Sequence, residues 1–138
     1  MIYIIGDSHV CAFVSKDPKK FIFGYKTVMK NYNFSVIRTQ PFVAFHLHNK
    51  IDYINNLIKI FGEIKQNDYL FFCYGEVDVR CHIGFNADKK NQSYKEACKD
   101  VVDNYFIFIR QMKKLYKNIG IYGPIPSGEN NCIQGNGR

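Results

Sequence analysis

Short apolar runs alternate with longer amphipathic stretches along the chain, and this alternation predicts its secondary structure. The first run, residues 2–5, is rich in isoleucine and stops at Gly6, as expected of a buried strand. Similar runs predict strands at residues 34–38, 69–74 and 119–122. Because strands that alternate with helices form parallel sheets with right-handed crossovers, we expect an α/β protein.

Two stretches have the apolar spacing of amphipathic helices. In the first, apolar residues recur from Ile51 to Ile64, with Asn49 as the expected N-cap. The second opens with Ser93 and Glu96, which have the spacing of a capping box. Its expected inner face consists of Ala97, Val101, Val102, Tyr105, Ile109, Met112 and Tyr116.

The remaining segments have no clear periodicity. Residues 15–33 fit no single element, although 21–23 could form a small strand or a lid. The polar segment 75–84 is expected to be a loop. We expect one domain over residues 1–126 and a Gly- and Asn-rich loop or tail over 127–138.

Composition narrows the classes of function. The net charge of +7 would attract anions, but the lysines form scattered pairs, so solvated faces explain them better than a nucleic-acid site does. Five cysteines without a Cys-x-x-Cys motif favour reduced thiols in a cytoplasmic compartment. We expect neither a signal peptide nor a membrane span, because the apolar runs are too short.

Polar residues follow directly after two of the predicted strands. Asp7, Ser8 and His9 come after the first strand, and the segment 76–82 follows the strand at 69–74. The carboxyl ends of parallel strands meet at one edge of the sheet, and ligands of open α/β sheets bind there. The two segments are therefore expected to face each other.

Ser8 is a candidate nucleophile. Gly6 permits a sharp turn, and a serine on a tight strand-to-helix turn exposes its hydroxyl and aims backbone N–H groups at an oxyanion. The alternative is that Ser8 only caps a helix. The presence of the second polar segment favours a site, and His9 is expected to pack or hydrogen-bond near the turn.

The second polar segment carries charged residues and a histidine at every other position. If it is extended, four side chains point the same way: Glu76, Asp78, Arg80 and His82. A neighbouring carboxylate could then orient His82 as a general base, and Arg80 could bind an oxyanion. Equally, the two acids and the arginine could form a buried ion-pair network that holds the segment.

Together, residues 6–9 and 75–82 resemble the SGNH (GDSL-like) hydrolases. The closest resemblance is to a branch that carries Gly-Asp-Ser-His and Gly-Glu-x-Asp-x-Arg-x-His at these places. The resemblance implies a flavodoxin-like, three-layer α/β/α sandwich. It also implies esterase, deacetylase or acyltransferase chemistry on an acylated glycan or lipid, with no metal and no cofactor.

The resemblance assigns roles to individual residues. Ser8 is the nucleophile and its own N–H an oxyanion donor, while Asp7 shapes the turn. Gly75 and Asp78 match the family's third block, and His82 is the best internal substitute for the base. The expected catalytic residues are Ser8, His82 and Asp78. The expected oxyanion- or substrate-binding residues are Gly75, Glu76, Arg80, Asp7 and His9.

The chain departs from the family pattern in three places. Val77 replaces an asparagine that donates to the oxyanion, a loss that costs about 100–1000-fold in rate. The family's second-block glycine has no clear counterpart, with Gln40-Pro41 near its place. The last block, Asp-x-x-His, is absent, and with it the usual base and the strand and helix that carry it.

Three hypotheses stay open at this point. The chain is a serine hydrolase acting on a small-molecule or glycan ester, or it is an inactive binding or structural protein with the same fold. The third hypothesis is a fragment, whose open sheet edge requires the missing part, a partner or a second copy.

For two further groups of residues, a structural role is favoured over a functional one. On a strand, His46 and His48 would point the same way and could bind a metal, but no third ligand has a suitable spacing, so a surface pair is favoured. Cys11, Cys73 and Cys81 could meet in space, and burial as structural thiols is the favoured interpretation.

Overall fold

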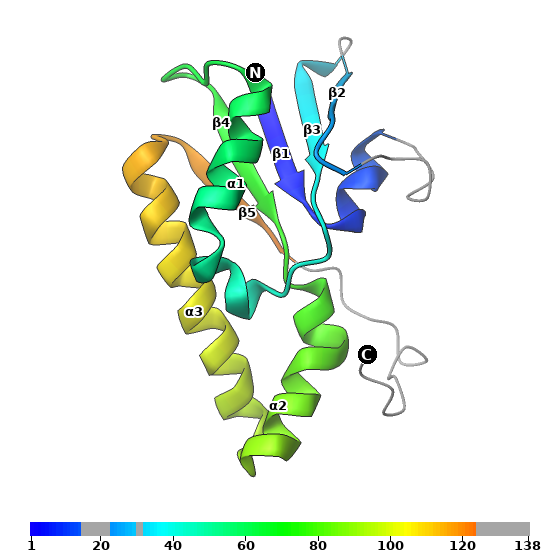
Figure 1. Ribbon diagram of the computed structural model, residues 1–138, viewed down its shortest axis with the longest axis vertical. Coiled ribbons are helices and arrows are strands. Elements are labelled where there is room, and N and C mark those ends of the chain that lie inside the picture. The colour runs from blue at the N-terminus through cyan, green and yellow to red at the C-terminus, as the bar shows by residue number, and fades with distance from the viewer. Residues whose placement is uncertain (15–22, 30–31, 124–138) are drawn as a thin grey trace.

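The computed structural model describes residues 1–14, 23–29 and 32–123, which form a sheet with helices packed against it (Figure 1). In these residues, five strands form one sheet in the order β2-β3-β1-β4-β5. They are β1 (Ile2–Gly6), β2 (Lys26–Met29), β3 (Phe34–Arg38), β4 (Tyr69–Cys73) and β5 (Ile119–Tyr122). All neighbours pair in parallel except β2, which is antiparallel to β3. The predicted α/β class, with a mostly parallel sheet, is confirmed.

Helical segments connect the strands. The α-helices are α1 (Ile51–Ile58), α2 (Ile83–Lys90) and α3 (Tyr94–Leu115). Shorter 3₁₀ segments are η1 (Ser8–Val14), η4 (Ala44–Asn49) and η5 (Lys59–Phe61), and η6 (Asp78–His82) is a turn of π-helix. Figure 1 shows α2 beyond the carboxyl ends of the strands, with α1 and α3 in front of the sheet.

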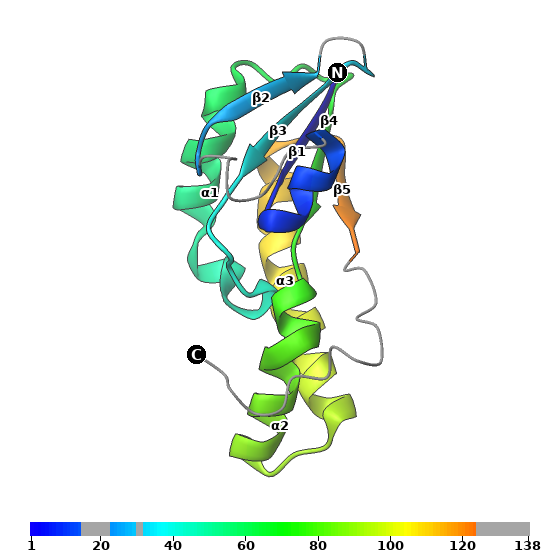
Figure 2. The same cartoon turned by 90° about the vertical axis from the view of Figure 1, so that its right-hand side faces the viewer.

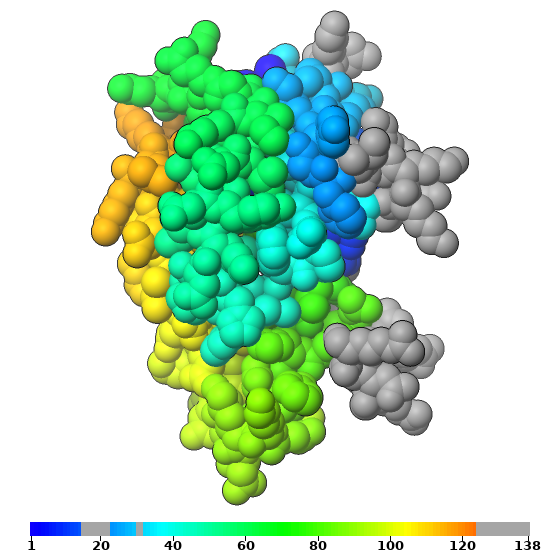
Figure 3. All heavy atoms as spheres, in the orientation of Figure 1, coloured from blue at the N-terminus to red at the C-terminus, as the bar shows by residue number. Residues whose placement is uncertain are grey.

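The larger core lies between the sheet and α1 and α3. Ile5 and Phe72 from the strands pack there with Ile54 of α1 and with Phe108 and Met112 of α3, all fully buried. In the space-filling view, atoms of α1 and η4 hide most of the central strands on this side (Figure 3). Burial of these apolar side chains is the main force that holds the sheet to its helices.

Helix η1 packs on the opposite face of the sheet (Figure 2). Its buried residues Val10, Cys11 and Val14 contact the apolar side chains on that face, among them Ile4 and Val36. The segment is only seven residues long. It therefore covers this face only in part.

The predicted capping box at the start of α3 is confirmed, because Ser93 Oγ accepts from the Glu96 N–H and Glu96 Oε2 accepts from the Ser93 N–H. The predicted inner face of α3 needs two corrections. Val102 is exposed, and Phe108 is buried in its stead. A helix turns about 100° per residue, so Val102 lies beside the buried stripe that runs through Val101, Tyr105 and Phe108.

The predicted helix over residues 51–64 is shorter than expected. It ends as α1 at Ile58 and continues as one 3₁₀ turn before Gly62, whose φ of 95° no longer fits a helix. Asn49 is not its N-cap: it ends η4, and Lys50 caps α1 without a side-chain hydrogen bond. The short strand β2 lies in a segment that the apolar pattern could not assign. As an edge strand, β2 has both polar and apolar residues, so it shows no apolar run.

Some expectations fall outside the described residues, namely those for Phe21, Ile22, Cys132 and the tail at 127–138. In the described part of the chain, no disulfide joins any two of Cys11, Cys73, Cys81 and Cys98. None of the helices described there combines the length and the hydropathy needed to cross a bilayer.

Candidate functional site

The two polar segments begin at the same edge of the sheet. Gly6 pairs with Cys73 in register, and the Asp7 N–H donates to the carbonyl of Cys73 at 3.2 Å. The ends of β1 and β4 therefore lie side by side, as the parallel order predicts. A Cβ on Gly6 would lie 2.1 Å from the Cys73 oxygen, so this close approach requires glycine.

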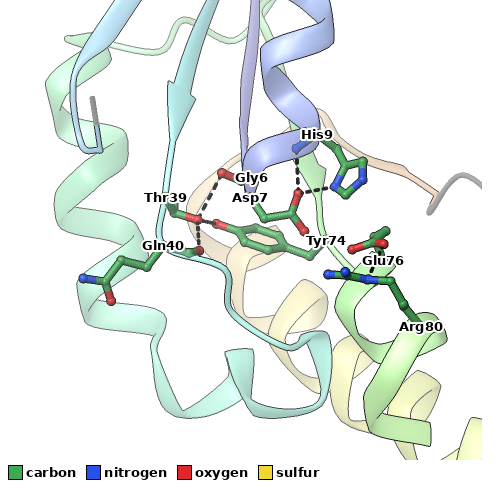
Figure 4. A network of polar contacts seen from close by, with 8 residues as sticks. All are labelled: Gly6, Asp7, His9, Thr39, Gln40, Tyr74, Glu76 and Arg80. Atoms are coloured by element: carbon green, nitrogen blue, oxygen red, sulfur yellow. Dashed lines mark hydrogen bonds and ion pairs between the residues drawn. The ribbon is translucent and has the colours of Figure 1, made fainter. Parts of the chain in front are cut away.

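Asp7 and His9 form a hydrogen-bonded pair directly after β1 (Figure 4). Asp7 is 1% exposed, and its Oδ1 accepts from both the backbone N–H and the ring Nδ1 of His9, each at 2.9 Å. Within the described residues its Oδ2 is buried without a hydrogen-bond partner. A buried carboxylate on Nδ1 fixes the orientation of an imidazole and leaves Nε2 as the free nitrogen.

Ser8 lies between these two residues as the first residue of η1 and is half-buried. The part of the chain that the structure describes offers its hydroxyl no hydrogen-bond partner. The polar geometry at this turn is therefore organised by Asp7 rather than by a side-chain cap from Ser8.

A second polar contact supports the same edge from β3 and β4. Thr39, just after β3, donates its hydroxyl to the carbonyl of Gly6 at 3.0 Å and lies 3.0 Å from the Tyr74 hydroxyl (Figure 4). Tyr74 is fully buried, and burial raises its pKa well above the ordinary value of 10. Sequence analysis missed both residues, although each directly follows a predicted strand or ends it.

The segment after β4 is helical, which corrects the expected extended loop. Gly75 has a φ of 110°, and the backbone is helical from residue 76 through Lys90, with η6 as a π-helical turn. Residues spaced by two do not share a face of a helix, so the four side chains at 76, 78, 80 and 82 do not point the same way. They form two separate pairs spaced by four.

Glu76 and Arg80 form the pair that faces the strand ends. Arg80 Nε lies 2.8 Å from Glu76 Oε1, and Glu76 is the less exposed of the two. Glu76 also lines a small hollow of about 10 Å³ together with Asp7, His9 and Tyr122. A hollow of this size holds about one water molecule. The structure thus brings four parts of the chain to one place. They are the residue after β1, η1, the helix that follows β4, and β5.

Asp78 has a different position and anchors two segments. It is completely buried, and its two carboxylate oxygens accept the backbone N–H groups of Ala44 at 2.6 Å and Phe45 at 3.2 Å. These are the first N–H groups of η4, which has no side-chain cap of its own. Burial raises the pKa of Asp78 despite these hydrogen bonds. Asp78 thus supports the site from a distance rather than lying in it.

His82 lies with His46 and Phe45, on the side of η6 that packs against η4. Its ring centroid is 5.6 Å from each of these rings, and its Nε2 is buried without a partner in the described residues. Burial, followed by the nearby His82 and His48, lowers the pKa of His46. No contact joins His82 to Ser8 in the described chain, whereas His9 directly follows Ser8 in sequence.

The remaining predicted groups are resolved by secondary structure and packing. His46 and His48 lie on the 3₁₀ helix η4 rather than on a strand, so positions two apart do not face the same way. Among the described residues, no three His, Cys, Asp or Glu side chains are arranged to hold a metal ion. Cys11 and Cys73 share a buried cluster, while Cys81 lies on η6 outside it. Burial and Asp7 raise the pKa of Cys73 to about 12.

The chain was compared with known proteins in three ways. Models of protein families, curated proteins and solved structures gave no match to this chain. Its function is therefore argued from its own residues.

Proposed function

We propose that the chain is a serine hydrolase of SGNH type that cleaves a small-molecule or glycan ester. The observation that carries the proposal is the buried Asp7 carboxylate bound to the ring of His9, on the turn that presents Ser8. A carboxylate, an imidazole and a hydroxyl at one strand end are the groups that acyl transfer needs.

The strand order supports the fold that this proposal requires. Without the antiparallel β2, the parallel strands in chain order read 2-1-3-4 across the sheet. This is the beginning of the flavodoxin-like order, in which ligands bind at the carboxyl ends of the first and third strands. Ser8 and Glu76 follow those two strands. The three-layer, flavodoxin-like sandwich is therefore part of the proposal.

In the proposed mechanism His9 takes the role first expected of His82. The Ser8 hydroxyl attacks the carbonyl carbon of the ester, and its proton moves to His9 Nε2. The buried Asp7 stabilises the imidazolium that forms. The proton then passes to the departing alkoxide, leaving an acylated Ser8. Water attacks this acyl group with His9 again as the base, which releases the acid and restores the serine.

The developing oxyanion requires donors, and Val77 supplies none from its side chain. The Ser8 N–H is one proposed donor. Arg80 is the other, because a guanidinium has five N–H donors and Nε is the atom that contacts Glu76. This assignment replaces the family's asparagine with a charged donor at the same edge of the sheet.

A fluorophosphonate probe tests the proposal, because it forms a covalent bond only with an activated serine. We expect mass spectrometry to place the label on Ser8 and expect Ser8→Ala to abolish labelling. Ser35→Ala is the matched control, because Ser35 is a buried serine near the amino end of β3, away from the carboxyl ends of the strands. Unlabelled Ser8 under conditions that label a known serine esterase would overturn the proposal.

A second candidate function is binding of an ester or glycan without turnover. It is favoured by the lack of a hydrogen-bond partner for the Ser8 hydroxyl within the described residues, and by Val77. Saturable binding that Ser8→Ala leaves intact, with no product after long incubation, would distinguish it from the hydrolase.

The proposed setting is the cytoplasm, which fits cysteines that form no disulfide with one another in the described residues. The edge of β5 is where a second copy or a further strand would extend the sheet. Sedimentation velocity over a range of concentrations tests for the second copy.

A further inference from the structure

An apolar groove lies on the η1 face of the sheet and reaches the polar site at one end. Its volume is about 260 Å³. It is lined by side chains of the strands, together with Phe13 of η1 and Tyr122 of β5. In the described chain the lining residues are all aliphatic or aromatic: Ile2, Ile4, Phe13, Phe34, Phe71 and Tyr122.

The rings around this groove are held in place by packing. Phe13 and Tyr122 meet edge to face with centroids 5.1 Å apart. The ring of Phe71 lies over Gly120, where an added Cβ would come within 2.5 Å of it. Despite this packing, Ile2 is 40% exposed. Apolar surface left in contact with water favours an apolar occupant.

Tyr122 connects the groove with the candidate site. It lines both the groove and the small hollow beside His9. In the sheet Tyr122 pairs with Cys73, which pairs with Gly6, so this end of the groove is level with the residue before Asp7. The far end is level with Ile2, four residues earlier on β1.

We infer that the groove binds a linear alkyl chain of about ten carbons, the length that fits four strand residues at about 3.3 Å each. An alkyl chain has no hydrogen-bond donor or acceptor along its length. It therefore suits a groove whose lining offers no hydrogen-bonding groups.

The inference that an alkyl chain binds rests on the groove alone. Only the further step, in which the chain is the acyl or alkoxy part of the ester cleaved at Ser8, rests on the proposed function. In that step the alkyl chain passes Tyr122, and its carboxyl end lies at the mouth of the hollow beside His9.

The test is calorimetric titration of the full chain with straight-chain primary alcohols from butanol to dodecanol. Affinity should rise about fourfold per methylene and stop rising near ten carbons, where the chain outgrows the groove. This series needs no variant. No binding, or binding that does not depend on chain length, would overturn the inference.

A matched pair of variants locates the binding. Ile2→Glu places a carboxylate in the groove, whereas Val28→Glu changes a residue of similar exposure, 43% against 40%, on β2 outside it. We expect at least a tenfold loss of decanol affinity for Ile2→Glu only, with both variants folded by circular dichroism. An equal effect of both variants contradicts the inference. It is also contradicted if decanol does not bind and sedimentation shows a dimer that Ile2→Glu dissociates.

The outcomes separate this inference from the proposed function. If Ser8→Ala leaves decanol binding unchanged and the probe does not label Ser8, the hydrolase proposal is contradicted and the alkyl site is supported. Labelled Ser8 without chain-length-dependent binding would do the reverse.

Discussion

The carboxylate of Asp7 accepts both the backbone N–H and the ring Nδ1 of His9, two residues along the chain. This local arrangement needs only the turn after β1 and the burial of Asp7 under the strand ends. It orients the imidazole of the residue that follows Ser8, at the edge where parallel-sheet proteins bind ligands.

Replacing Asp7 tests whether this pair is functional. Asp7→Asn should lower the rate of fluorophosphonate labelling of Ser8 by about 10³–10⁴-fold, because an amide no longer stabilises the imidazolium and permits the wrong tautomer. Asp52→Asn, at an exposed acid of α1, should leave the rate unchanged. A wild-type labelling rate in folded Asp7→Asn would mean that the pair is only structural.

Gly6 is expected to tolerate no side chain. Gly6→Ala would place a Cβ 2.1 Å from the carbonyl oxygen of Cys73 and force β1 and β4 apart. We expect a loss of about 3 kcal/mol or more in the free energy of unfolding, measured with urea. Gly123→Ala, which meets nothing within 4 Å, is the control and should change it by less than about 0.5 kcal/mol.

Asp78 should contribute to stability rather than to chemistry. Asp78→Ala leaves the N–H groups of Ala44 and Phe45 without acceptors, which costs about 2–4 kcal/mol in the free energy of unfolding. Asp88→Ala removes an exposed carboxylate of α2 and should have little effect. If Asp78→Ala kept full stability and lost only labelling of Ser8, a catalytic role would replace the structural one.

The cluster of His46 and His82 predicts a titration. Burial and then His82 lower the pKa of His46 below 6.5, so the unfolded chain takes up this proton first as the pH falls. The stability due to neutral His46 is therefore complete above about pH 6.5 and is lost as the pH falls through its lowered pKa. In an NMR titration, His82→Gln should raise the pKa of His46, and His9→Gln should not. Equal pKa values in all three proteins would show that His82 lies away from His46.

Local patterns were enough for the elements with strong signals. The capping box at Ser93 and the apolar runs of β1, β3, β4 and β5 were predicted correctly, because caps and buried strands depend on nearby residues. The exposed strand β2 was missed, because its burial on one side only leaves no apolar run.

The sequence by itself determined the alternation of strands and helices, and hence that the segments after β1 and β4 share one edge of the sheet. Only the tertiary structure decided what the side chains do there. Helix formation after Gly75 sends Asp78 to the start of η4 and His82 to His46, and it leaves Glu76 and Arg80 at the strand ends. The reason is physical: residues 76–83 alternate polar and apolar, a period that by itself favours an extended segment, so packing against η4 rather than the local pattern makes the choice of a helix.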